Sequence, residues 1–169
     1  MNAISWNSRA RRGLFAILWL LMTGLLAHAS GLRVNPTPSL PKGVYRVTPD
    51  QDLAKGDLVS FCLQGNFADL AKERGYLQAG SCENGLRPLL KHLAGLPGDY
   101  IPTDYLVVRA VDSQGRPMPS IPLSGVIPSA MALVLADHEG SFDSRYFGLV
   151  PLESLQRVEP VLVFNPKGE

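Results

Sequence analysis

Residues 37–43 read Thr-Pro-Ser-Leu-Pro-Lys-Gly, and the rest of the chain is interpreted around them. Proline fixes its own φ angle and pushes the preceding residue into an extended conformation. Pro38 and Pro41 therefore predict a stiff, extended backbone around Ser39, and a short strand is expected to start at Gly43. A serine in this setting is either an ordinary loop residue or a nucleophile, and the stretch alone leaves both interpretations open.

The composition predicts a mainly β fold and excludes several kinds of partner. The chain has 169 residues, 14 prolines, 16 glycines and a formal net charge of +1. This length allows one small domain after an N-terminal segment, and the many prolines and glycines favour turns and short strands. No basic run with interleaved aromatic residues is present, so no nucleic acid is expected. The cysteines and histidines lack metal-ligand spacing, so neither a metal nor a cofactor is expected.

The N-terminal segment has the pattern of an export signal or a membrane anchor. A polar stretch with three arginines precedes an apolar run at residues 13–27, which ends in Ala27-His28-Ala29. Positive charge before an apolar run keeps the N-terminus in the cytoplasm and sends the following residues across the membrane. The small-x-small ending suits cleavage, whereas extension of the run to Leu32 approaches the length of a span. Residues 1–30 are therefore either a cleaved signal or a retained anchor, and residues 31–169 form a domain outside the cytoplasm.

The expected location changes the interpretation of the two cysteines. In an oxidising compartment, Cys62 and Cys82 are expected to form a disulfide, which contributes about 3 kcal/mol in the chain-entropy model. Two buried free thiols are the alternative. The disulfide would staple an excursion from the sheet at residues 65–87, in which Asn66 is expected to cap a short helix that runs to Arg74. Strands are expected at residues 43–47, 57–63, 105–111, 131–136 and 161–164, with an extended stretch at 116–128.

Lys91 stands in the apolar stretch Leu-Leu-Lys-His-Leu-Ala-Gly-Leu at residues 89–96. Strand alternation places its side chain on the same face as Leu89 and Leu93. If that face is the core, desolvation lowers the pKa of the ammonium group, and a neutral amine can act as general base for a hydroxyl. A lysine that extends its ammonium group back to solvent is the alternative.

A third group of polar residues follows the expected strand at 131–136. Residues 141–148 read Ser-Phe-Asp-Ser-Arg-Tyr-Phe-Gly. Asp143 and Arg145 are suited to an ion pair or mutual hydrogen bonding. Ser144 is suited to donate a hydrogen bond to a neutral lysine amine and hold it in place. By itself this segment is a polar loop.

Together these three segments resemble the motifs of type I signal (leader) peptidases, in the same order along the chain. Ser39 lies in a Ser-x-Pro-x-Gly setting, Lys91 precedes Gly95-x-Pro97-Gly98-Asp99, and residues 141–148 form the last motif. The Ser-x-Pro-x-Gly form and the small size are more specifically similar to the conjugative-transfer peptidases of the TraF type. Two positions depart from the leader peptidase pattern: His92 replaces an arginine, and Ala136-Asp137-His138 replaces Gly-Asp-Asn.

The resemblance implies a signal-peptidase-like all-β fold and a Ser-Lys catalytic dyad. It assigns Ser39 as nucleophile, Lys91 as general base, and the Thr37 hydroxyl with the Ser39 N–H as oxyanion hole. It assigns Ser144 to orient the lysine, and Asp143 with Arg145 to brace the site. The implied function is maturation of a pilin precursor, by hydrolysis or cyclisation, on the periplasmic side of the bacterial inner membrane. The membrane and other proteins of the conjugation apparatus are the further expected partners.

Two other interpretations remain open at this stage. Ser39-x-x-Lys42 matches the Ser-x-x-Lys of penicillin-recognising enzymes, but that motif needs a helix, whereas Gly43 and the following residues predict a strand. The chain also lacks Ser-Asp-Asn and Lys-Thr-Gly. The second alternative is a non-catalytic envelope β-domain that binds pilin or other transfer components without cutting them.

Overall fold

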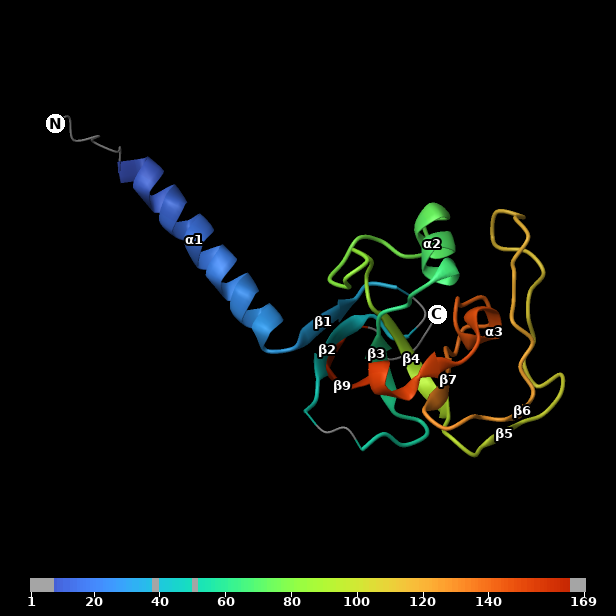
Figure 1. Cartoon of the computed structure of the whole chain (residues 1–169). Coiled ribbons are helices and arrows are strands. Elements are labelled where there is room, and N and C mark those ends of the chain that lie inside the picture. Colours follow the sequence, from blue (N-terminus) through green and yellow to red (C-terminus); the bar gives the residue numbers. More distant parts are fainter. Residues whose placement is uncertain (1–7, 38–39, 50–51, 165–169) are drawn as a thin grey trace.

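The computed structural model describes residues 8–37, 40–49 and 52–164 of the chain (Figure 1). A seven-stranded antiparallel sheet forms the body, in the order β1-β2-β9-β3-β4-β7-β8. Its strands are β1 Leu32–Asn35, β2 Gly43–Val47, β3 Leu58–Phe61, β4 Leu89–Gly95, β7 Met131–Leu135, β8 Val150–Pro151 and β9 Gln156–Val163. The predicted mainly β fold is confirmed.

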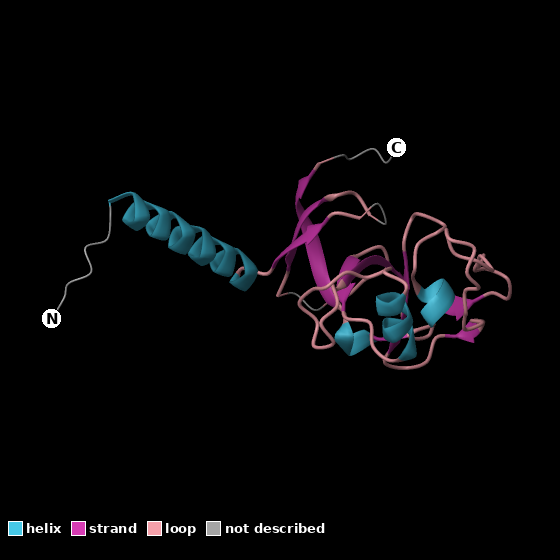
Figure 2. Ribbon diagram, turned by 90° about the horizontal axis from the view of Figure 1, so that it is seen from above, coloured by secondary structure: helices cyan, strands magenta, loops and turns pink. Residues whose placement is uncertain are grey.

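The remaining elements are short, except for the N-terminal helix. They are α1 Ser8–Ala29, α2 Asn66–Glu73, α3 Ser144–Phe147, the 3-10 helix Leu152–Ser154, and a two-stranded sheet of β5 Tyr100–Ile101 and β6 Gly125–Val126. Figure 2 shows α1 extending away from the strands, with α2 and α3 close to the sheet. The apolar side chains of α1 between Leu14 and Leu26 are exposed. Among the described residues, no helix has both the length and the apolar character needed to cross a membrane.

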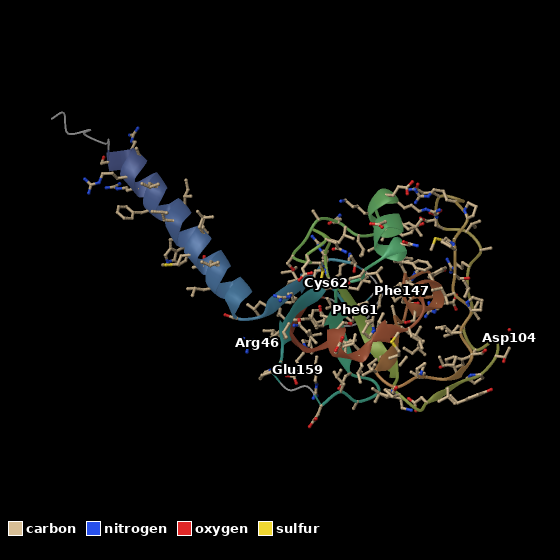
Figure 3. All side chains as sticks on the ribbon, viewed as in Figure 1. Arg46, Phe61, Cys62, Asp104, Phe147 and Glu159 are labelled. Carbon is tan, nitrogen blue, oxygen red and sulfur yellow. A yellow bond between two sulfur atoms is a disulfide. The ribbon has the colours of Figure 1, made fainter. Side chains whose placement is uncertain are left out.

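The core lies where β3, β4 and β7 pack against α3. Burial alternates along β4, as its sequence predicts, so that Leu89, Lys91 and Leu93 all face inward. Phe61 of β3 contacts Phe147 of α3 edge to face, with ring centroids 6.1 Å apart. Figure 3 shows these two rings inside the body. Lys91 is therefore a cationic side chain on the apolar face of a central strand.

The predicted disulfide between Cys62 and Cys82 is present, with the two Cα atoms 5.7 Å apart. It joins the end of β3 to the segment that follows α2, as predicted. The prediction that Asn66 caps α2 is wrong: Gly65 is the N-cap residue, and no side chain caps this helix end. The helix itself runs from Asn66 to Glu73, with Arg74 as its C-cap residue, close to the predicted bounds.

The prediction of a strand at residues 105–111 is wrong. These residues lie in the long connection between β5 and β6, where a single bridge joins Val111 to Pro117. Their β-branched and aromatic side chains predicted a strand, but Tyr105 and Val107 are exposed and have no partner strand to cover them. Figure 3 places Asp104 at the outer end of this connection, far from Phe61.

The last strand is longer than predicted, and several short elements were not predicted. β9 begins at Gln156 rather than at residue 161, because its first half pairs with both β3 and β2. Pro160 falls beside an irregularity in the pairing with β2, where a missing N–H can be accommodated. The elements that were not predicted are β1, β5, β8, α3 and the 3-10 helix, while β6 falls within the stretch expected to be extended.

Candidate active site

Lys91 is almost completely buried, with only 1% of its surface exposed. It lies in the middle of β4, opposite Val59 of β3, and its side chain lines a cleft of about 360 Å³. Burial lowers the pKa of its ammonium group from 10.5 to about 8, against the opposing effect of the Asp143 carboxylate and with a further lowering by Arg145. A substantial fraction of Lys91 is therefore neutral near pH 8 and able to accept a proton.

Asp143 is fully buried and joins α3 to β7. Its carboxylate accepts hydrogen bonds from the backbone N–H of Ala136, at 2.9 Å, and of Arg145, at 3.1 Å. The second bond caps the N-terminus of α3. Burial raises the pKa of this carboxyl, while these hydrogen bonds and the positive charges of Arg145 and Lys91 oppose the rise.

Arg145 holds the turn that forms the rim of the cleft. Its guanidinium lies 3.6 Å from the Asp143 carboxylate and donates to the backbone oxygens of Ala136, His138 and Glu139. The predicted ion pair between Asp143 and Arg145 is present. Since His138 and Gly140 line the cleft, the pair fixes the turn beside Lys91.

The serine predicted to orient Lys91 has a different hydrogen bond. The Ser144 hydroxyl accepts from the backbone N–H of Val134 at 3.0 Å, and within the described part of the chain no hydrogen bond connects it to Lys91. Ser141, by contrast, lines the same cleft as Lys91 and is 6% exposed. The structure thus brings the Ser141 hydroxyl to the cleft, although the sequence analysis assigned no role to Ser141.

Ser39 lies outside the described residues, but the chain on both sides of it is held by Asn35. The Asn35 side chain is buried and donates to the backbone oxygens of Leu40 and Pro41, at 3.2 and 3.3 Å. Its Oδ1 atom accepts from the backbone N–H and the hydroxyl of Thr37, at 3.2 and 2.7 Å. One amide at the end of β1 therefore clamps the residues that flank positions 38 and 39.

Thr37 lines the cleft together with Lys91, as its predicted role requires. Its hydroxyl proton is directed to Asn35 at 2.7 Å. To donate to an oxyanion, the Thr37 hydroxyl has to rotate away from Asn35. The Asn35 Oδ1 atom would then still accept the hydrogen bond from the backbone N–H of Thr37. The contribution of Thr37 to an oxyanion hole therefore stays a prediction.

Substitution of Asn35 tests the predicted role of Ser39 as nucleophile. If that prediction holds, Asn35→Ala is expected to lower kcat for cleavage by about tenfold while leaving KM within about twofold, because a loosened nucleophile spends less time in the reactive position. Steady-state kinetics on a precursor peptide measure the split. Val34→Ala is the matched control, since Val34 is the neighbouring, exposed residue of β1. Equal kinetics for Asn35→Ala and wild type would mean that the clamp does not position the nucleophile.

Lys42 does not have the geometry of a Ser-x-x-Lys base. Residues 40–42 are not helical, and β2 starts directly after them at Gly43. The Lys42 side chain is exposed, and Lys42 is absent from the residues that line the cleft. Within the described residues, no group of three or more His, Cys, Asp or Glu side chains is placed to hold a metal ion.

Comparison with known proteins agrees with this arrangement. Residues 9–161 match the family model described as signal peptidase, peptidase S26. A probable conjugal transfer protein TraF of Sinorhizobium fredii is 34% identical, over 96% of this chain and 97% of that protein. The conjugal transfer protein TraF of Agrobacterium tumefaciens is 39% identical, over 83% of this chain and 87% of that protein. A plasmid transfer protein TraF of Escherichia coli is 32% identical, over 81% and 85%. No solved structure matches the chain. The chain belongs to the signal peptidase family S26.

Proposed function

We propose that the protein is a membrane-associated serine endopeptidase that matures a pilin precursor for conjugative plasmid transfer, on the periplasmic side of the inner membrane. The observation that carries the proposal is the burial of Lys91 in a cleft, where its pKa falls to about 8. A lysine on the surface would be charged at neutral pH and could not take a proton. Family membership and the names of the relatives support the substrate class.

In the proposed reaction, the neutral amine of Lys91 takes the hydroxyl proton of Ser39 as Oγ attacks the carbonyl carbon of the scissile bond. The Ser39 N–H and the Thr37 hydroxyl stabilise the negative charge on the carbonyl oxygen. The protonated Lys91 then gives its proton to the leaving amine, and an ester on Ser39 remains. Water hydrolyses the ester, or an amine of the substrate attacks it and forms a new peptide bond, which cyclises the pilin.

The test uses the full-length protein in liposomes with the pilin precursor encoded by the same conjugative element. Wild type is expected to release a shortened or cyclised product, which mass spectrometry identifies, and Ser39→Ala to release none. Ser30→Ala is the control, because this serine is exposed and its hydroxyl donates to the backbone oxygen of Leu26 in α1. Product release by Ser39→Ala would contradict the assignment. Binding of the precursor without cleavage by wild type would favour a non-catalytic binding domain.

A further inference from the structure

A second cavity, of about 550 Å³, lies beside the cleft that contains Lys91. Val111 and Met118 of the β5–β6 connection line one side of it, and Phe142 and Tyr146 line the other. These side chains are mainly apolar. Arg109, at the same cavity, is half exposed and lies 3.7 Å from the Glu139 carboxylate, so its charge is partly compensated. The cavity therefore favours an apolar group.

The two cavities share a wall. Tyr76, His138, Gly140 and Phe142 line both of them. The rings of Tyr76 and Phe142 form the centre of this wall, with their centroids 5.4 Å apart. The two cavities therefore adjoin at these shared residues.

The outer side of the second cavity is held in place by Asp112. Its carboxylate accepts hydrogen bonds from the Tyr76 hydroxyl, from the Arg116 side chain at 2.6 Å, and from backbone N–H groups of the same turn. Burial alone would raise the pKa of Asp112, but the bonds from Tyr76 and Arg116 hold it well below its ordinary value. Arg74, at the end of α2, donates to the backbone oxygen of Pro117 at 2.8 Å. The β5–β6 connection is thus tied to the wall of the cleft by hydrogen bonds on both sides of the turn at Asp112.

We propose that this second cavity is a subsite for an apolar side chain of the peptide substrate, some residues away from the scissile bond. The inference rests on the proposed function, since it takes the occupant of the Lys91 cleft to be a peptide. An extended peptide advances about 3.3 Å per residue and turns alternate side chains to the same face. A peptide bound in the cleft therefore reaches the shared wall and places a side chain beyond it. The β5–β6 connection then contributes to substrate selection as well as to the fold.

The test fills the cavity from a position that tolerates substitution. Ala110 lines the cavity and is exposed, so Ala110→Trp narrows the cavity without disturbing the core. Val107→Trp is the matched control, because Val107 belongs to the same connection, is 78% exposed and lines neither cavity. With the full-length protein in liposomes and the pilin precursor, Ala110→Trp is expected to raise KM by about tenfold with kcat within about twofold, as loss of one buried apolar side chain implies. Val107→Trp is expected to match wild type.

A scan of the precursor identifies the side chain that binds. Each apolar residue near the cut is replaced by aspartate, and one such change is expected to raise KM by about tenfold for wild type and by less than about twofold for Ala110→Trp. Additive effects at every position, or equal kinetics of Ala110→Trp and Val107→Trp, would overturn the subsite.

Photo-crosslinking separates failure of the subsite from failure of the proposed function. p-Benzoylphenylalanine is placed at position 110 or 107 of the full-length chain, and the pilin precursor is added before irradiation. Crosslinking from position 110 but not from 107 supports the subsite even where no cleavage occurs, and in that case only the catalytic proposal fails. Cleavage by wild type without crosslinking from position 110 overturns the subsite and leaves the catalytic proposal standing.

Discussion

Lys91→Ala is expected to lower kcat/KM for precursor cleavage by about a thousandfold or more, whereas Lys42→Ala is expected to change it by less than about twofold. Both substitutions remove one lysine, but only Lys91 is buried in the cleft. A residual rate is expected in Lys91→Ala from substrate binding and from the proposed oxyanion hole, neither of which needs the base. Steady-state kinetics with the full-length proteins in liposomes measure both variants.

The pH dependence of the same reaction is the second part of this test. Since the proposed mechanism needs Lys91 as the free base, kcat/KM of wild type is expected to rise with pH and to level off above the Lys91 pKa of about 8. Lys42→Ala is expected to keep that profile. If Lys42→Ala abolished cleavage and Lys91→Ala did not, the base would be the lysine of the Ser-x-x-Lys sequence and the dyad would be wrong.

Lys91→Met is expected to stabilise the protein at pH 7 by about 3 kcal/mol while it abolishes cleavage. The pKa of Lys91 is about 8 in the folded protein and 10.5 in the unfolded chain. Between these values the unfolded chain binds more protons, so the free energy of unfolding of wild type rises with pH in this window. Below pH 8 both states are protonated, and the full cost of the buried charge, about 3 kcal/mol, is present. Methionine has a similar length and no charge, so it removes this cost.

Urea unfolding of full-length wild type and Lys91→Met at pH 7 and pH 10.5 measures the difference. The gain from Lys91→Met is expected to shrink by most of its value at pH 10.5, since Lys91 is then neutral in the folded protein and half neutral in the unfolded chain. Lys42→Met is the control and is expected to have little effect at either pH. Equal gains at both pH values, or a loss of stability at pH 7, would show that the buried amine is not the source of the cost. The expected result is that Lys91 lowers the free energy of unfolding of the wild-type protein, at the position where the proposed mechanism needs a base.

The sequence predicted best where a local pattern determines the structure. Alternation along residues 89–95 placed Lys91 on the buried face, because the side-chain period of a strand is fixed by its backbone. The link between Cys62 and Cys82 followed from the expected compartment and is present. The sequence at residues 141–148 predicted an ion pair between Asp143 and Arg145, and the structure contains it.

The sequence predicted poorly where partners come from distant parts of the chain. Residues 105–111 have the side chains of a strand but lie beyond the edge of the sheet, so no ladder forms. β1 is too short for a periodic pattern, and it exists because β2 folds back onto it. The clamp by Asn35 depends on a turn whose geometry no spacing rule gives. Ser141 and Ser144 cannot be distinguished by sequence, because both are hydroxyls within one motif and only the fold directs one of them to the cleft.

The junction between α1 and the body limits how far the cleft can move relative to the helix. Ser30 continues the last turn of α1 through its bond to Leu26, and the Gly31 oxygen accepts from the backbone N–H of Val47 at the end of β2. Two residues, Ser30 and Gly31, connect the end of α1 to the start of β1, so this connection can extend by at most about 10 Å. The connection between α1 and the body is therefore short, and both of its residues make backbone hydrogen bonds. Any structure that immobilises α1 also sets the height and orientation of the cleft above it.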